Sequence, residues 1–226
     1  MQMPLKFRLV ILISLLLAVF YFAFMSSFTK SGFIRQYANT YPQASPNVIT
    51  PESYDFLRRL SDAALESTKS HVTYNASYMV IPYPNGDVPI NLGVCSDVII
   101  RSYRAVGIDL QREVHEDMKE NFLSYPHIWR LLKPDTNIDH RRVPNLMTYF
   151  KRQGACLAIS DKPDHYLAGD IVAWHLGKGV MHIGVVTHLF STNMQRPLIV
   201  HNIGRGPQSE DALFSWPIIG HYRYKN

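Results

Sequence analysis

The amino-acid sequence predicts an α+β domain in which helices pack on one side of an antiparallel sheet. Four segments with the apolar spacing of amphipathic helices lie between residues 51 and 154. From residue 170 the pattern changes to short segments that are rich in valine, isoleucine and aromatic residues, separated by glycine, proline, asparagine or serine. Helices that come first and strands that follow, joined by short connections, are typical of the α+β class.

The composition excludes several classes of protein. The chain has 226 residues, of which 46% are hydrophobic and 18% charged, as expected of a packed globular domain and not of a disordered chain. The net charge of +5 is spread along the chain without a run of more than two Lys or Arg residues, so we expect no nucleic-acid binding. The two cysteines, Cys95 and Cys156, are too few for a disulfide scaffold or a cysteine-based zinc site.

The amino terminus carries a predicted membrane-targeting segment over residues 1–28, either a signal anchor or a signal peptide. Residues 9–25 contain no charged side chain and are about as long as a helix that crosses a bilayer. Lys6 and Arg8 precede this hydrophobic helix and favour the cytoplasmic side, so the rest of the chain is expected across the membrane. In a bacterium this predicts the periplasm, with the protein anchored to the inner membrane through its N-terminal helix or secreted after cleavage. The match to an A-x-A cleavage site is poor, which favours the anchor.

Residues 29–50 form a predicted tether to the folded domain, 51–226. The tether is rich in Ser, Pro, Asn, Gln and Tyr and shows no hydrophobic periodicity. Thr50 and Pro51 are typical of a helix start, and the apolar positions after them predict a helix over 51–68. The folded domain is therefore expected to begin with an amphipathic helix.

The next predicted elements lead to Cys95. A strand or extended arm over 78–81 is followed by a turn over 84–87 and by a loop that ends at Cys95. Ser96 and Asp97 favour the opening of a helix directly after it. The remaining predicted helices cover 114–122 and 143–150, and the predicted strands cover 170–176, 182–188, 197–202 and 221–224.

Cys95 is the first candidate for chemistry because of its position at a helix N-terminus. Free N–H groups and the positive end of the helix dipole stabilise a thiolate there, and the thiolate is the nucleophilic form. A lone cysteine is more often a small apolar core residue, and we interpret Cys156 in this way. A cysteine hydrolase also needs a base and a group that orients the base.

Histidines in the predicted strands supply these partners. His182 opens a strand directly after the Gly177–Gly179 turn, at a sheet edge expected to face the helix. His201 and Asn202 lie in the following strand, where an antiparallel neighbour places one of them against the second ring nitrogen of His182. Because successive strand residues point to opposite faces, only one of the two can orient His182.

A series of motifs in a fixed order supports this interpretation. They are Tyr83, Gly86, Cys95-Ser96, Gly169-Asp170-Ile171-Val172, His182-Ile183-Gly184 and Ile199-Val200-His201. From about residue 54 onward, the chain resembles the bacterial family called domain of unknown function 1287. More broadly it resembles the NlpC-like branch of the papain-fold cysteine peptidases, many of which cut cell-wall peptides. It departs from that branch at Val94 and Asp97, which puts the substrate specificity in question.

The resemblance implies a papain-like (NlpC-like) fold and a set of roles. Cys95 is the nucleophile, His182 the base, His201 the orienting residue, and Tyr83 lies near the scissile carbonyl. We favour His201 over Asn202 on the motif alignment, although Cys-His-His and Cys-His-Asn are both chemically sound. The implied activity is cleavage of an amide bond, with peptidoglycan stem peptide as the substrate and no cofactor.

Two other functions compete with a cysteine hydrolase. His175, His182, His188 and His201 lie near Asp170 in sequence and are potential zinc ligands. However, His182 and His188 would be about 20 Å apart on one strand, which is too far for one ion. The remaining histidines, His221 among them, are interpreted as surface or half-buried residues. The other alternative is a catalytically silent module of the same fold that binds cell wall or a partner protein.

Overall fold

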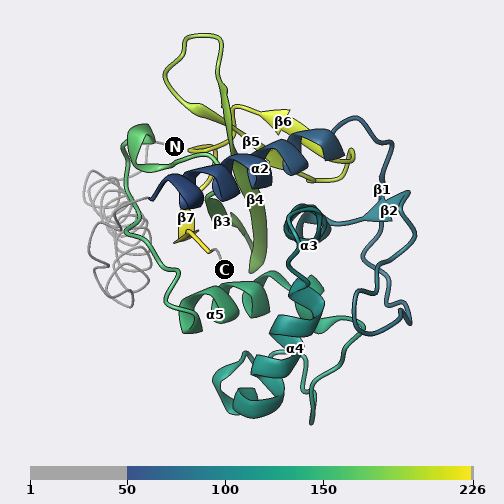
Figure 1. Ribbon diagram of the computed structural model, residues 1–226. Coiled ribbons are helices and arrows are strands. Elements are labelled where there is room, and N and C mark those ends of the chain that lie inside the picture. The colour runs from purple at the N-terminus through teal and green to yellow at the C-terminus, as the bar shows by residue number, and fades with distance from the viewer. Residues whose placement is uncertain (1–49, 225–226) are drawn as a thin grey trace, which may run out of the picture. The chain divides into compact units, whose positions relative to one another are not determined.

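The computed structural model describes residues 50–224 as a helical part packed on a five-stranded sheet (Figure 1). The predicted membrane-targeting segment 1–28 and almost all of the predicted tether lie outside the described residues. Within 50–224, no helix is long and apolar enough to span a bilayer. The α+β class predicted from the sequence is confirmed at this level.

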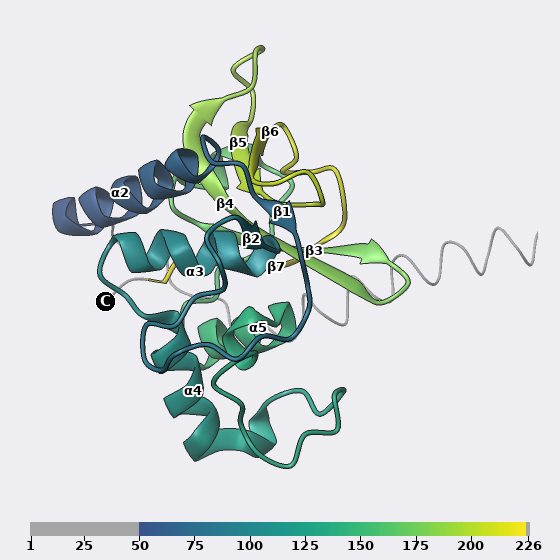
Figure 2. The same cartoon turned by 90° about the vertical axis from the view of Figure 1, so that its right-hand side faces the viewer.

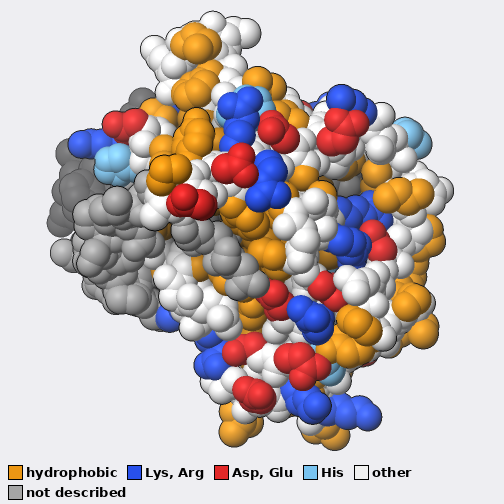
Figure 3. All heavy atoms as spheres, in the orientation of Figure 1, with side chains coloured by type: hydrophobic (Ala, Val, Ile, Leu, Met, Phe, Trp, Pro, Cys, Tyr) orange, Lys and Arg blue, Asp and Glu red, His pale blue; other side chains and the backbone are white. Residues whose placement is uncertain are grey.

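The predicted helices all form, close to their expected bounds. They are α2 (Pro51–Ser67), α3 (Cys95–Ala105), α4 (Leu110–Asn121) and α5 (Val143–Arg152), with short 3-10 turns η1 (Phe122–Ser124), η2 (Asp139–Arg141) and η3 (Pro163–His165). The Thr50 hydroxyl accepts the Ser53 N–H at 3.2 Å, as the predicted helix start requires. Exposed ion pairs form along α2 and just after its end. Positive and negative side chains are accordingly mixed on the face shown in Figure 3.

The sheet is antiparallel throughout, with strand order β6-β5-β4-β3-β7. Its strands are β3 (Ile171–Gly177), β4 (Val180–Phe190), β5 (Pro197–His201), β6 (Gln208–Glu210) and β7 (Ile218–Tyr222). Three of the four predicted strands form where expected. The fourth, β7, begins at Ile218 instead of His221 because Ile218 pairs with Trp174 of β3. The short edge strand β6 has no hydrophobic alternation, so its sequence contains no strand signal.

The sequence predicts a strand or an extended arm over residues 78–81, and no strand forms there. The Ile81 N–H donates to the Asn137 side chain at 2.9 Å. Instead, β1 (Thr73–Tyr74) and β2 (Leu92–Gly93) form a two-residue parallel pair just ahead of α3. This small ladder fixes the chain immediately before Cys95.

In Figure 1, α2 crosses in front of the sheet and α3 is seen end-on beside β4. In Figure 2, both helices lie to one side of the sheet. Phe150 of α5 packs on Tyr103 of α3 and Tyr222 of β7, with ring centroids 6.0 and 5.5 Å apart. The buried Trp174 belongs to a second apolar cluster, in which Leu213 and Tyr166 come from the connections between elements. The helices therefore cover one face of the sheet, as predicted, and the connecting segments contribute side chains to the second apolar cluster.

Candidate active site

Cys95 is the first residue of α3 and is only 5% exposed. Its thiol lies within hydrogen-bonding reach of the Ile183 main-chain N–H on β4 and of the Ser96 N–H at the helix start. These donors lower the thiol pKa, but burial outweighs them and raises it to about 11. The sequence predicts a thiolate at this helix N-terminus, whereas the structure has a neutral thiol at pH 7.

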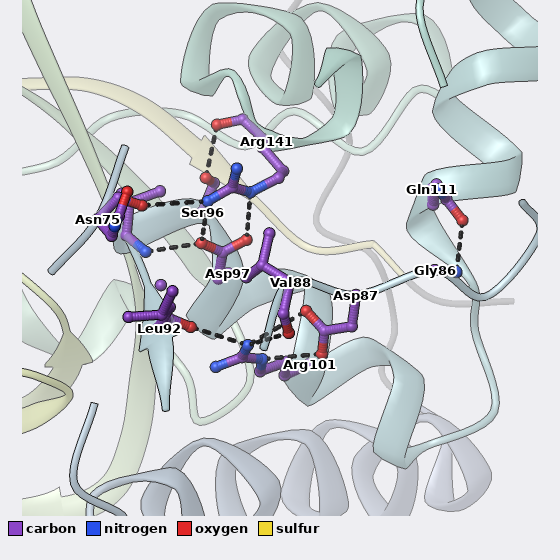
Figure 4. Close-up of polar contacts among 12 residues, drawn as sticks. Asn75, Gly86, Asp87, Val88, Leu92, Ser96, Asp97, Arg101, Gln111 and Arg141 are labelled. Carbon is purple, nitrogen blue, oxygen red and sulfur yellow. Dashed lines mark hydrogen bonds and ion pairs between the residues drawn. The ribbon is translucent and has the colours of Figure 1, made fainter. Parts of the chain in front are cut away.

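A buried ion pair supports the start of α3 (Figure 4). The Asp97 carboxylate accepts from the Arg141 guanidinium at 2.9 and 3.0 Å and from the Val94 N–H at 2.6 Å. The Ser96 hydroxyl donates to the Arg141 carbonyl at 2.6 Å. Asp97 is therefore the third residue of α3 and caps the helix by accepting the Val94 N–H. The sequence predicts it instead at the start of the helix. Val94 and Asp97 are the two positions that depart from the NlpC-like pattern, and they are hydrogen-bonded to each other at the start of α3.

His182 lies in a series of hydrogen bonds that crosses three strands. Its Nε2 is 2.7 Å from Nδ1 of His201 on β5, and Nε2 of His201 is 3.0 Å from a carboxylate oxygen of Glu210 on β6. Both histidine side chains are buried. Burial, with a further contribution from His201, lowers the pKa of His182 to about 3, so this ring is neutral at pH 7.

The structure brings Cys95 to the backbone of Ile183, next to His182, but it forms no hydrogen bond between the thiol and the imidazole. The described residues engage His182 only through Nε2. Catalytic hydrogen bonds are often long in enzymes without substrate and shorten when substrate binds. The two residues therefore lie on adjacent elements and are not hydrogen-bonded to each other.

Gly184 permits the close approach of the two histidine strands. A Cβ added at this position would lie 2.7 Å from the Ile199 side chain and 3.1 Å from Cβ of His201. The glycine of the His182-Ile183-Gly184 motif thus leaves the space that His201 occupies.

Asn202, the alternative to His201, has a different environment. Its side-chain N–H donates to the Gly93 carbonyl at 3.4 Å, and its side-chain oxygen accepts the Gly204 N–H at 3.1 Å. Asn202 lies one residue beyond the end of β5 and contacts the segment ahead of α3. His201, and not Asn202, contacts His182.

Tyr83 does not lie beside Cys95. Its hydroxyl donates to Glu116 of α4 at 2.6 Å, and its ring packs edge-on against His115. Burial and the Glu116 carboxylate raise the Tyr83 pKa to about 12. The expectation that Tyr83 stands near a scissile carbonyl is corrected, because α4 holds this side chain.

Tyr74 is the tyrosine near the thiol, and the sequence reasoning missed it. Burial raises its pKa, with a further contribution from the charge of an ionised Cys95. Tyr74 pairs with Gly93, two residues before Cys95, through the β1–β2 ladder. A two-residue parallel ladder has no detectable pattern in a sequence, so no signal identified Tyr74.

A comparison of the sequence with known families bears on this arrangement. A family model described as "Domain of unknown function (DUF1287)" matches residues 61–224. The chain belongs to the DUF1287 family. It is also 48% identical over 183 residues to "Uncharacterized protein YijF" of Escherichia coli (strain K12), which covers 81% of this chain and 88% of that protein. No solved structure matches the chain. The resemblance to DUF1287 is confirmed, and the narrower NlpC-like papain fold is a matter for proposal.

A cavity of about 280 Å³ adjoins the candidate site in this DUF1287 chain. Gly93, Val94 and Asn202 line it on the side of the site, and Val72 and Val98 contribute apolar surface. Neither Cys95 nor His182 lines the cavity. It therefore neighbours the segments that carry Cys95 and His201 and is lined by neither of these two side chains.

Of the four histidines considered as zinc ligands, His182 and His201 contact each other. Within residues 50–224, no group of three or more His, Cys, Asp or Glu side chains has an arrangement that could hold a metal ion. His188 instead contacts α2, with its Nδ1 at 3.0 Å from the Ser61 hydroxyl and 3.3 Å from the Asp62 carboxylate.

His221 is fully buried, which corrects its interpretation as a surface or half-buried residue. Its Nε2 is 2.8 Å from the Asp170 carboxylate, and its Nδ1 is 3.1 Å from the Ala158 carbonyl. Arg223 binds the same carboxylate at 2.7 and 2.8 Å. The second cysteine, Cys156, lies nearby on a bridge to Tyr222, and both cysteines are free thiols.

Proposed function

We propose that this protein is a cell-envelope cysteine hydrolase with an NlpC-like papain fold that cleaves an amide bond. One observation carries the proposal. A thiol at a helix N-terminus lies against the backbone of Ile183, next to a histidine whose ring is held from behind by a second histidine. A nucleophile, a base and an orienting group in this order form a catalytic triad.

The proposed mechanism starts from a neutral Cys95 thiol and a neutral His182 ring. His201 holds Nε2 of His182, so Nδ1 takes the proton of the Cys95 thiol as sulfur attacks the amide carbonyl carbon. N–H groups at the start of α3 stabilise the oxyanion. The His182 imidazolium then protonates the leaving nitrogen, the C–N bond breaks, and an acyl-thioester forms. Water, deprotonated by His182, attacks the thioester and releases the carboxylic acid and the thiol.

We propose peptidoglycan stem peptide as the substrate and the periplasm as the location. The hydrophobic run over residues 9–25, with Lys6 and Arg8 before it, supports export through the inner membrane, where the N-terminal helix stays as an anchor or is cleaved. The branch of peptidases that the chain resembles supports a cell-wall amide. A reporter active only outside the cytoplasm, fused after Asn226, should be active, and an inactive fusion would contradict the location.

A catalytically silent binding module is the second candidate. The observation that favours it is the burial of Cys95, which leaves a neutral thiol without a hydrogen bond to His182. Such a thiol is also what a packed core cysteine looks like.

The decisive experiment incubates the full-length protein, purified in detergent, with purified peptidoglycan. Mass spectrometry of the released fragments identifies the bond that is cut. Cys95→Ala should abolish release, and Cys156→Ala, which removes the other buried thiol, should not. A thiol alkylator should stop the reaction and a chelator should not. Release by the Cys95→Ala protein would contradict the cysteine mechanism, and binding to peptidoglycan without release would favour the silent module.

A further inference from the structure

We infer that Glu210 is a positioning residue that sets the protonation states of both histidines, an inference that rests on the proposed function. Glu210 ends the short edge strand β6, and the sequence provides no reason to single it out. Its carboxylate is the last member of the hydrogen-bond series that runs from His182 on β4 through His201 on β5 to the edge of the sheet.

The register of the strands places these side chains on one face. Glu210 pairs with Ile199, and His201 lies two residues after Ile199, so the two side chains share a face of adjacent strands. One carboxylate oxygen lies 3.0 Å from Nε2 of His201, and the other lies 3.2 Å from the exposed Arg205 guanidinium. The Glu210 side chain is 35% exposed, while that of His201 is inaccessible to solvent. The hydrogen-bond series therefore begins at the buried ring of His182 and ends near water.

The chemistry of the groups assigns the protons. An ionised carboxylate only accepts hydrogen bonds, so Nε2 of His201 must carry its proton. Nδ1 of the neutral His201 is then an acceptor, and Nε2 of His182 must donate to it. This leaves a lone pair on Nδ1 of His182, which is the form that can accept the proton of Cys95.

Without the Glu210 carboxylate, the two histidine rings can carry their protons on the other nitrogen. His201 can then carry its proton on Nδ1 and donate to Nε2 of His182, which moves the proton of His182 to Nδ1. A ring in that form cannot act as a base toward Cys95. Glu210 also stabilises the positive charge that His182 acquires during the reaction, through the intervening ring.

A purely structural role for Glu210 predicts something different. Its partner Arg205 is 76% exposed at the side chain, and an exposed ion pair contributes about 0–1 kcal/mol to stability. The neighbouring Asp211 forms a comparable surface pair with Arg196, at 2.6 Å. Asp211→Asn therefore removes a carboxylate from the same short segment without touching His201 and is a matched control.

The first measurement needs no substrate. The full-length protein with ¹⁵N-labelled histidine is studied by NMR, which distinguishes protonated from unprotonated ring nitrogens. In the wild type and in Asp211→Asn, His182 should be protonated at Nε2 and unprotonated at Nδ1. In Glu210→Gln the amide can donate to Nε2 of His201, and the protons of both rings should move to their Nδ1 atoms. Unchanged ring nitrogens in this variant would overturn the inference, whether or not the protein is a hydrolase.

The second measurement is kinetic. Glu210→Gln should lower kcat by about 10- to 100-fold with little change in KM, because a residue that orients a base acts on the chemical step. Glu210→Asp, which keeps the acceptor, should recover part of the loss and serves as the second variant if Glu210→Gln folds poorly. A kcat for Glu210→Gln within twofold of that for Asp211→Asn would overturn the inference. If Cys95→Ala retains activity, the proposed function fails, but the NMR result still tests the protonation states.

Discussion

Two buried histidine sites on the same sheet differ in how the protein engages their rings. On β7, both ring nitrogens of His221 have protein partners, the Asp170 carboxylate and the Ala158 carbonyl. On β4, the described hydrogen bonds of His182 involve one nitrogen only, and its partner is another imidazole. A ring with both nitrogens engaged connects segments of the fold, whereas a ring with one nitrogen left can exchange a proton.

The two sites also differ in how a carboxylate is placed relative to the histidine ring. Asp170 is buried and binds His221 directly together with Arg223, which compensates its charge. Glu210 is partly exposed and reaches His182 only through His201. A carboxylate placed one ring away sets the proton positions of His182 without forming an ion pair with it. The difference separates a structural histidine from a candidate base within one sheet.

The largest effect should come from the reactive pair. Cys95→Ala and His182→Ala should each lower kcat by at least about 10³-fold, and the double variant should be hardly worse, because residues that act as a unit are not additive. Steady-state kinetics on peptidoglycan fragments measures this. His175→Ala and His188→Ala are the controls and should lose little. Full additivity of the two losses would show that Cys95 and His182 act separately.

The next largest effect should come from alanine variants at each of the two histidine sites. His221→Ala should lower the free energy of unfolding by about 2–4 kcal/mol, because it leaves a cavity and removes a buried partner of Asp170, while kcat of the folded protein stays unchanged. His201→Ala should lower kcat strongly. Denaturant unfolding and kinetics on the same samples test both. A loss of kcat in His221→Ala comparable to that in His201→Ala would remove the distinction between the sites.

Gly184→Ala should perturb the spacing between β4 and β5. The new methyl group would lie too close to Ile199 and His201, so we expect a destabilisation of about 1–3 kcal/mol and an approximately tenfold lower kcat. His182 should then lose its short contact with His201, which the histidine NMR spectrum reports. A variant with full activity and an unchanged spectrum would show that the spacing between β4 and β5 does not matter.

The smallest effect concerns the two thiols. Burial raises the pKa of both Cys95 and Cys156 to about 11, so both are protonated at neutral pH. The alkylation rate of each by iodoacetamide should rise with pH through the neutral range, because the thiolate fraction grows up to the thiol pKa. Mass spectrometry of each cysteine peptide measures the two rates. A plateau for Cys95 alone near pH 6.5 would show a thiolate–imidazolium pair at rest, as the sequence had suggested.

The sequence predicts those features that depend on local patterns. The helix from Thr50, the three longer strands β3 to β5, and the neighbouring positions of Cys95 and His182 all follow from periodicity, capping residues and motif order. The surroundings of residues 78–81 and of Tyr83 do not follow from local patterns, because contacts with Asn137 and Glu116, which are distant in sequence, decide them.

Burial explains the other failures. The helix N-terminus alone favours a thiolate at Cys95, but the residues that exclude water from it come from other segments. The positions of Tyr74 and Glu210 depend on two very short strands, β1 and β6, which contain too few residues to show a period. Features of this kind become visible only when the strands are paired.

The ion pair between Asp97 and Arg141 has a consequence for the timing of activity. Cys95 lies in the first half of the chain, but the support of its helix start comes from η2, and the base, its orienting residue and Glu210 follow after residue 180. Under the proposed mechanism, a growing chain therefore carries Cys95 before its proposed base, and the catalytic group cannot assemble until strands β4 to β6 have been synthesised.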